Sequence, residues 1–200
     1  MTNRTSPPGR KRLVATMARL LRKQGFAATG LNQLVAESGA PKGSLYHYFP
    51  GGKDEVAAEA LVFAGQLVRG TLDALRQSER TPAGIVRAYG TLLEGWMAKS
   101  GYSDGCPITT TLLEVATDKP AIAAIGRDAF ADWQAVFADA LRGAGVEADR
   151  ADELGLAAIM MIEGSLILAR VQRNGAPIRV ATQEVAALFE RAGSQDAGTS

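Results

Sequence analysis

The 200-residue chain is poor in cysteine and histidine, two residue types that often build disulfides, metal sites and acid–base catalytic sites. It has one cysteine, Cys106, which excludes an internal disulfide and any metal site made of several cysteines, and which suits a reducing cytoplasm. It also has one histidine, His47. A lone histidine lacks the partners of a metal site, and no carboxylate lies near it in the sequence to orient it as a catalytic base. We therefore expect no metal, no cofactor and no enzyme activity.

Long hydrophobic runs are missing as well. Residues 1–12 are polar, so no signal peptide is expected. The most apolar run, Leu154 to Val171, is short for a bilayer span of about 20 residues and contains Glu163, so we interpret it as a buried helix. The chain shows no strand-like alternation and no internal repeat. These absences predict an all-α, cytoplasmic protein with no membrane partner.

Charge is present in both signs but is unevenly placed. Residues 1–53 hold nine Lys/Arg and one acid, Glu37, which gives a net charge of +8. The remaining 13 basic and 20 acidic residues give residues 54–200 a net charge of −7. A basic N-terminal part joined to an acidic remainder is typical of a DNA-binding domain fused to a domain with another role.

Helical periodicity and helix-ending residues predict the first three helices. A stripe of apolar residues predicts a helix from about Arg10 to Gln24, ended by a glycine. A second helix is expected from Leu31 to Ser38, and a third is expected to start at Pro41, where a missing N–H is harmless. This spacing predicts a helix-turn-helix whose last helix suits the major groove of DNA.

Every later element is expected to be helical too. The predicted helices cover about residues 53–77, 82–99, 107–117, 120–142, 149–173 and 181–191. We therefore predict a helix-turn-helix domain at residues 1–52, a ligand-binding and dimerisation domain at 53–193, and a flexible tail at 194–200. The helix from Asp149 is apolar on too many sides for the surface of a monomer, and with the last helix it is expected to form half of a four-helix dimer interface.

The sequence GFAATGLNQLVAESGAPKGSLYHYFPGGKDEVAAEAL, Gly25 to Leu61, closely resembles the TetR family of bacterial transcriptional regulators. FPGGK, together with GCPI at Gly105 to Ile108, resembles its LmrA/YxaF-like branch. The resemblance implies an all-helical homodimer that binds a palindromic double-stranded DNA operator through its N-terminal domains. It also implies that the C-terminal domain holds a pocket for a small-molecule inducer.

Eight residues are predicted to contact DNA. The resemblance assigns phosphate contacts to Thr29 and Lys53, and base or phosphate contacts to four residues of the third helix. The exposed side of the two helices adds a hydroxyl and an amide that suit the same roles. The full set is Thr29, Gln33, Lys42, Gly43, Ser44, Tyr46, His47 and Lys53. Two departures from the family pattern, Gly30 in place of a Ser/Thr cap and Pro41 in place of Ser, each remove a possible phosphate hydrogen bond.

Apolar and aromatic residues of the C-terminal part suggest a ligand pocket, with threonines 109–111 and Glu114 as possible polar anchors. The alternative is that at least half of these residues belong to the core, and that Glu163 forms a structural salt bridge rather than an inducer contact. The predicted ligand-binding residues are Trp96, Met97, Tyr102, Thr109, Leu113, Phe130, Trp133, Phe137, Met160 and Glu163.

The function expected from these observations is that of a homodimeric transcriptional repressor, released from its operator by a small hydrophobic ligand. One alternative is a DNA-binding regulator without a small-molecule input, acting constitutively or through a protein partner. Another is an enzyme that carries a helix-turn-helix, which no catalytic or cofactor motif in the sequence supports.

Overall fold

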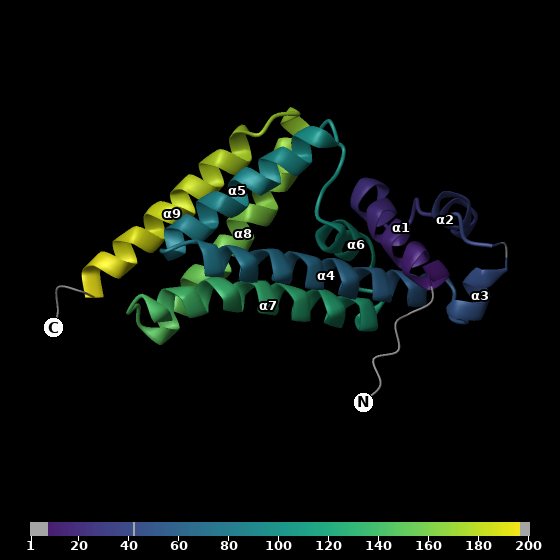
Figure 1. The fold of residues 1–200 in the computed structure, drawn as a ribbon, viewed down its shortest axis with the longest axis horizontal. Helices are drawn as coiled ribbons and strands as arrows, with labels where there is room; N and C mark the ends of the chain where they lie inside the picture. Colours follow the sequence, from purple (N-terminus) through teal and green to yellow (C-terminus); the bar gives the residue numbers. More distant parts are fainter. Residues whose placement is uncertain (1–7, 42, 197–200) are drawn as a thin grey trace. The chain divides into compact units, whose positions relative to one another are not determined.

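The computed structural model describes residues 8–41 and 43–196, and over these residues it contains helices and no strand (Figure 1). This confirms the all-α prediction. The helices are α1 (Pro8–Gln24), α2 (Leu31–Ser38), α3 (Ser44–Tyr48), α4 (Lys53–Ser78), α5 (Pro82–Lys99), α6 (Pro107–Val115), α7 (Pro120–Gly143), α8 (Ala148–Gln172) and α9 (Ala176–Asp196).

The chain forms two compact units. Unit 1 comprises the chain up to Gln66 together with Cys106–Arg127, and unit 2 comprises Leu67–Gly105 together with the chain from Asp128 onward. Helices α4 and α7 each contribute residues to both units. The two units do not divide the chain between residues 52 and 53, because unit 1 also includes the first half of α4 and the whole of α6. The assignment of separate functions to residues 1–52 and 53–193 stays a prediction. Of the predicted tail at 194–200, residues 194–196 belong to α9, and residues 197–200 lie outside the described residues.

Unit 1 is built around α1, which packs against α2, α3 and α6. Its apolar stripe is fully buried, and Leu34, Leu45 and Phe49 close the core from the following two helices. Gly25 ends α1 with a φ of +80°, a conformation that favours glycine. The apolar residues of α1 therefore determine how α2 and α3 pack against it.

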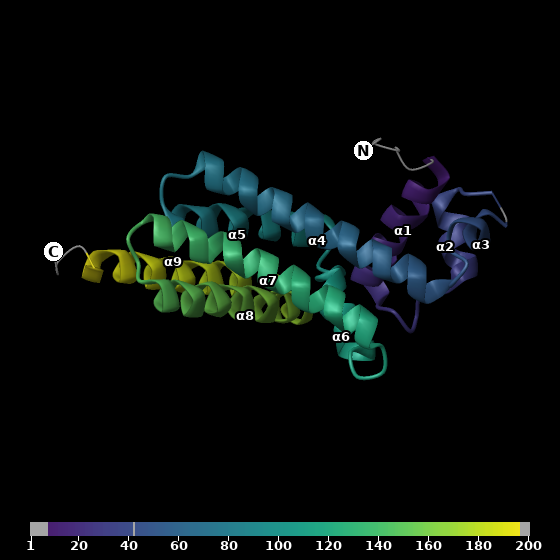
Figure 2. The same ribbon diagram turned by 90° about the horizontal axis from the view of Figure 1, so that it is seen from below.

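Unit 2 contains α5, α8 and α9, and α9 packs against both of the others (Figure 2). Gly90 of α5 lets α9 approach closely, since a Cβ at this position would lie 2.5 Å from the hydroxyl of Thr182. Exposed ion pairs join the same two helices at Arg87–Glu190 and Arg179–Glu94. Exposed pairs of this kind add little stability, so burial of apolar side chains holds this unit together.

Two helix starts differ from prediction, and both lie close to a proline. The third helix begins at Ser44 and not at Pro41, because Gly43 adopts a φ of +91° that the helix cannot include. The last helix begins at Ala176 and not at Ala181. The predicted break after α8 is present but shorter than expected, because Pro177 lies in the first turn of α9, where a proline is tolerated.

Helix α8 is long and apolar enough to cross a membrane by length and composition. Less than half of its most apolar stretch is buried in the chain, and core helices of soluble proteins pass the same test. Its exposed apolar residues follow one side of the helix at Leu156, Met160, Ile167, Leu168 and Val171. We call these five residues the α8 stripe; exposed apolar patches of this kind often mark an interaction surface.

Replacing Thr111 with valine is expected to stabilise the protein by about 0.5–1 kcal/mol, because the substitution removes a desolvated hydroxyl without changing the side-chain shape. Thr111 is fully buried in α6, and its Oγ1 is the one buried side-chain polar atom of the described residues that has no hydrogen-bond partner. Urea denaturation measures the change. Thr110→Val is the control, since the Thr110 hydroxyl donates to the Cys106 carbonyl at 2.7 Å and its loss should not stabilise. A destabilised Thr111→Val variant would show that the hydroxyl has a partner in solution.

Candidate nucleic-acid interface

The turn between α2 and α3 has the geometry of a helix-turn-helix. Gly39 caps the end of α2 with a φ of +61°, and Gly43 precedes α3 with a φ of +91°. Between them Ala40 is buried, and the Pro41 carbonyl accepts both the backbone N–H of Ser44, at 3.0 Å, and its hydroxyl, at 2.8 Å. Two left-handed glycines thus turn the chain sharply and leave α3 on the surface.

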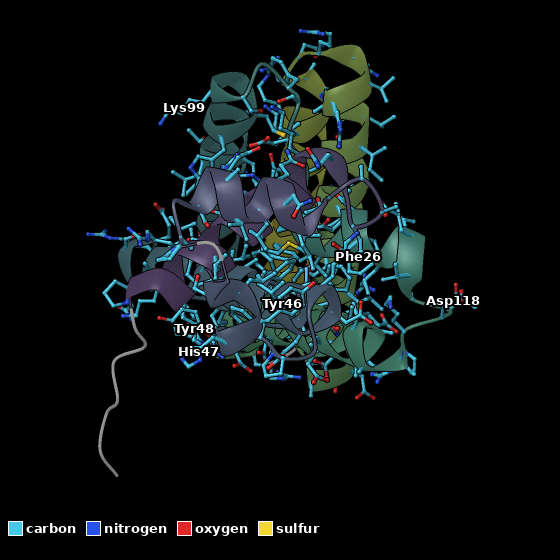
Figure 3. All side chains as sticks on the ribbon, turned by 90° about the vertical axis from the view of Figure 1, so that its right-hand side faces the viewer. Phe26, Tyr46, His47, Tyr48, Lys99 and Asp118 are labelled. Atoms are coloured by element: carbon cyan, nitrogen blue, oxygen red, sulfur yellow. The ribbon has the colours of Figure 1, made fainter. Side chains whose placement is uncertain are left out.

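The outer side of α3 presents Tyr46 and His47. Tyr46 is 63% exposed and His47 is exposed, while Leu45 between α3 and the core is buried. His47 also contacts the ring of Tyr48 edge to face, with ring centroids 5.1 Å apart, and all three aromatic side chains lie on α3 (Figure 3). Both the Tyr46 hydroxyl and the His47 ring nitrogen are thus free of the core and suited to donate to phosphate oxygens or base edges.

The hydroxyl groups of two predicted DNA contacts, Thr29 and Ser44, form hydrogen bonds within the protein. Thr29 is 1% exposed, and its hydroxyl donates to the Gly25 carbonyl at 2.6 Å, so it closes the turn after α1 and does not lie on the outer surface. The Ser44 hydroxyl is half-buried and donates inside the α2–α3 turn. Neither arrangement favours a direct phosphate contact by these hydroxyl protons. Lys42 lies outside the described residues, and Gly43 is exposed with open space around it.

Gln33 is held in a chain of polar contacts along α1 and α2. Its Oε1 accepts from Gln24 at 2.9 Å, and its Nε2 donates to Glu37 at 2.8 Å. Arg19 donates to the other oxygen of Glu37 at 2.6 Å, and this hydrogen bond is the main reason that the pKa of Glu37 lies below its ordinary value. Gln33 therefore reaches a base only if it gives up one of these contacts, which sequence reasoning did not foresee.

Lys53 lies at the start of α4 beside the turn that follows α1. Its Nζ is 4.4 Å from the ring centroid of Phe26 and 3.4 Å from the Ala27 carbonyl oxygen. Partial burial lowers the pKa of Lys53, and the nearby charge of Glu114 opposes this effect. The ammonium group is thus half-buried and fixed in direction rather than free in solvent, as suits a residue that contacts one defined phosphate.

Sequence reasoning missed Phe26 and Glu114 as neighbours of Lys53. Glu114 lies 61 residues after Lys53, at the end of α6, and sequence reasoning placed it near a ligand pocket. The signal present in the sequence is the Gly25-Phe26 pair after the first helix, which indicates an aromatic side chain turned inward at a sharp turn.

The predicted ligand-binding residues occupy varied environments. Met97, Trp133 and Phe137 are buried, and Phe137 packs against Phe189 with ring centroids 6.1 Å apart, as a core residue does. Leu113 is 77% exposed, and Met160 is 60% exposed in the α8 stripe. The half-buried ones are Tyr102, Thr109, Phe130 and Glu163, and Trp96 is exposed. Thr109 and Leu113 belong to unit 1 and the others to unit 2, so a single pocket lined by all ten stays a prediction.

No group of three or more His, Cys, Asp or Glu side chains suited to a metal occurs in the described part of the chain.

The fold and the α2–α3 turn define the class of helix-turn-helix DNA-binding proteins. Residues 13–60 match the family "Bacterial regulatory proteins, tetR family", and residues 82–184 match "Transcriptional regulator LmrA/YxaF-like, C-terminal domain". The chain belongs to the TetR family of DNA-binding transcriptional regulators, in its LmrA/YxaF-like group.

Individual relatives agree with this assignment. The uncharacterized HTH-type transcriptional regulator YxaF of Bacillus subtilis (strain 168) is 32% identical over 184 residues, which cover 92% of this chain and 96% of that protein. The regulator LmrA of the same strain is 31% identical over 84% of this chain and 90% of its own length. A crystal structure of regulatory protein TetR from Rhodobacter sphaeroides has the same fold, with a TM-score of 0.82, 21% identity, and coverage of 90% of this chain and 98% of that one. These matches confirm the family predicted from Gly25 to Leu61, and they are to regulators, not enzymes.

Proposed function

We propose that this regulator is a cytoplasmic homodimeric repressor that binds a palindromic operator and leaves it when a small hydrophobic ligand binds. The observation that carries the DNA-binding part is the exposure of Tyr46 and His47 on α3, at the surface of a segment with a net charge of +8. A basic surface supplies the phosphate attraction, and side chains of one exposed helix supply the readout.

The α8 stripe supports the dimer. Its five apolar side chains are 47–75% exposed along one helix, an arrangement that is costly in water and is relieved by pairing with a second copy. A two-fold dimer presents two copies of α3, and it therefore suits an operator with two-fold symmetry and half-sites about 34–36 Å apart.

Repression and ligand release are the simplest regulatory outcome. A protein that occupies promoter DNA blocks transcription by steric exclusion alone, with no further contact surface. The ligand acts only by binding more tightly to a conformer with the wrong spacing of the two α3 helices. The LmrA/YxaF-like C-terminal domain, residues 82–184, is the part in which such a ligand is expected to bind.

The test measures fluorescence anisotropy of labelled DNA from upstream of the protein's own gene, at several salt concentrations and beside a random duplex. We expect salt-sensitive binding with at least about 1,000-fold preference for one site. Addition of hydrophobic compounds then identifies the inducer by release of that DNA. Equal, weak binding to all duplexes would contradict the proposal. Specific binding that no small molecule changes would favour a regulator without a small-molecule input.

A further inference from the structure

We propose that Glu114 is a positioning residue for Lys53, and that it sets the strength of DNA binding from outside the helix-turn-helix. The inference rests on the proposed function and on the phosphate contact that the family resemblance predicts for Lys53. Glu114 belongs to α6 and Lys53 begins α4, and both lie in unit 1. The turn after α1 lies between them and contacts both.

The side chain of Glu114 holds this turn by a hydrogen bond to the backbone of the turn. The carboxylate Oε2 of Glu114 accepts the N–H of Ala27 at 2.5 Å. The site for this carboxylate exists because residue 25 is glycine: a Cβ there would lie 1.8 Å from Oε1 and 2.9 Å from Cδ of Glu114. Gly25 also has a φ of +80°, so the backbone conformation and the close approach both require glycine. The contact is thus built into the turn and does not result from a chance surface approach.

The same turn holds Lys53 from its other side. The carbonyl of Ala27 is 3.4 Å from Lys53 Nζ, and the ring of Phe26 lies against the ammonium group at 4.4 Å. Ala27 therefore contacts both side chains: its N–H donates to Glu114, and its C=O lies against the ammonium group of Lys53. When the turn moves, the ammonium group of Lys53 loses the ring and the carbonyl that define its direction.

Neighbouring charges complete the arrangement. Lys119, just after α6, lies 5.4 Å from the ring centroid of Phe26 and donates to Asp54 at 2.5 Å. Two ammonium groups near one ring repel each other, and the charge of Lys119 contributes to the lowered pKa of Lys53. Glu114 and Asp54 oppose that repulsion. Removing Glu114 thus leaves Lys53 facing Lys119 with less compensation.

Glu114 could act on DNA binding only as a negative charge or by positioning Lys53, and these two roles predict opposite effects of its removal. If Glu114 acts only as a negative charge near DNA, its removal strengthens binding, because one repulsive carboxylate is gone. If it positions Lys53, its removal weakens binding, because a phosphate contact is lost. The direction of the change therefore decides between the two.

The experiment uses the full chain and a duplex that the wild-type protein selects from a random-sequence pool. Anisotropy gives the Kd of wild type, Glu114→Ala, Lys53→Ala and the double variant at several salt concentrations. We expect Glu114→Ala to weaken binding roughly 5- to 20-fold, as for loss of one charge-assisted hydrogen bond. We also expect it to flatten the salt slope, and to add little to Lys53→Ala. Glu114→Gln keeps an acceptor oxygen and should recover part of the loss.

Asp118→Ala is the matched control. Asp118 lies four residues further on, in the α6–α7 turn (Figure 3), and its exposed carboxylate forms no hydrogen bond or ion pair with the described residues. Its loss should leave the Kd unchanged or slightly lower. The proposal is overturned by Glu114→Ala binding as tightly as wild type, or by an equal loss in the Lys53→Ala background. If Glu114→Ala melts below the assay temperature, the same cycle with Glu114→Gln decides. Failure of the wild-type protein to select any sequence would instead overturn the proposed function.

Discussion

Replacing Ile167 with glutamate is expected to make the protein monomeric and to abolish tight operator binding. Ile167 lies in the middle of the α8 stripe and is 49% exposed, so a glutamate there is tolerated in a single folded chain. At a two-fold interface the substitution buries two unpaired carboxylates close together. We expect the dimer Kd to rise on the order of 100-fold or more, because each buried charge costs several kcal/mol. Analytical ultracentrifugation measures the dimer, and anisotropy measures the DNA.

Gln172→Glu gives the matching control for this prediction. Gln172 is exposed near the end of the same helix, and its substitution introduces the same charge outside the α8 stripe. The control should remain dimeric and bind the operator normally. A dimeric Ile167→Glu variant would place the dimer interface elsewhere. A monomeric variant that still binds the operator tightly would remove the need for two-fold DNA recognition.

Replacing Tyr46 with alanine is expected to weaken operator binding on the order of 100-fold, because the two copies of α3 in a dimer each lose about 1–3 kcal/mol. The side chain is 63% exposed and makes no contribution to the core, so the melting temperature should change little. Tyr46→Phe separates the hydroxyl from the ring. Weakening equal to that of alanine assigns the effect to the hydroxyl, and wild-type binding assigns it to ring contacts.

Lys99→Ala is the control for Tyr46. Lys99 ends α5 in unit 2, and its loss removes an exposed positive charge that the proposed interface does not use. Its operator Kd should match that of the wild-type protein. If Tyr46→Ala and Lys99→Ala behave alike, α3 is not the recognition helix.

Local sequence predicted most of the helices because their signals are local. The range of the second helix, Leu31 to Ser38, matches the structure, since a glycine adopts the left-handed conformation directly after it. The prediction of helix starts failed at prolines, because a proline occurs both in turns and in the first turn of a helix. Pro41 and Pro177 both suit a helix start, but the first lies in a turn ahead of Gly43, and the second lies inside a helix that begins before it.

Side-chain contacts were harder to predict. Exposure of Tyr46 and His47 followed from helical spacing, because Leu45 and Phe49 must face the core. The burial of Thr29 did not follow from spacing, since its hydroxyl binds a carbonyl within the turn. Contacts of Gln33 with Gln24 and Glu37 depend on how α1 and α2 pack, which periodicity does not specify.

The sequence by itself determined the class of this protein: helical periods, left-handed glycines and a basic N-terminal segment are local or compositional, and they specify a helix-turn-helix regulator. Only the tertiary structure decided which charges meet. Glu114 and Lys119 come from a segment more than 60 residues after Lys53, yet all three surround Phe26 and Ala27. Contacts between such distant segments depend on packing of the whole unit, because the cost of closing a long loop is met only by the core that forms around it.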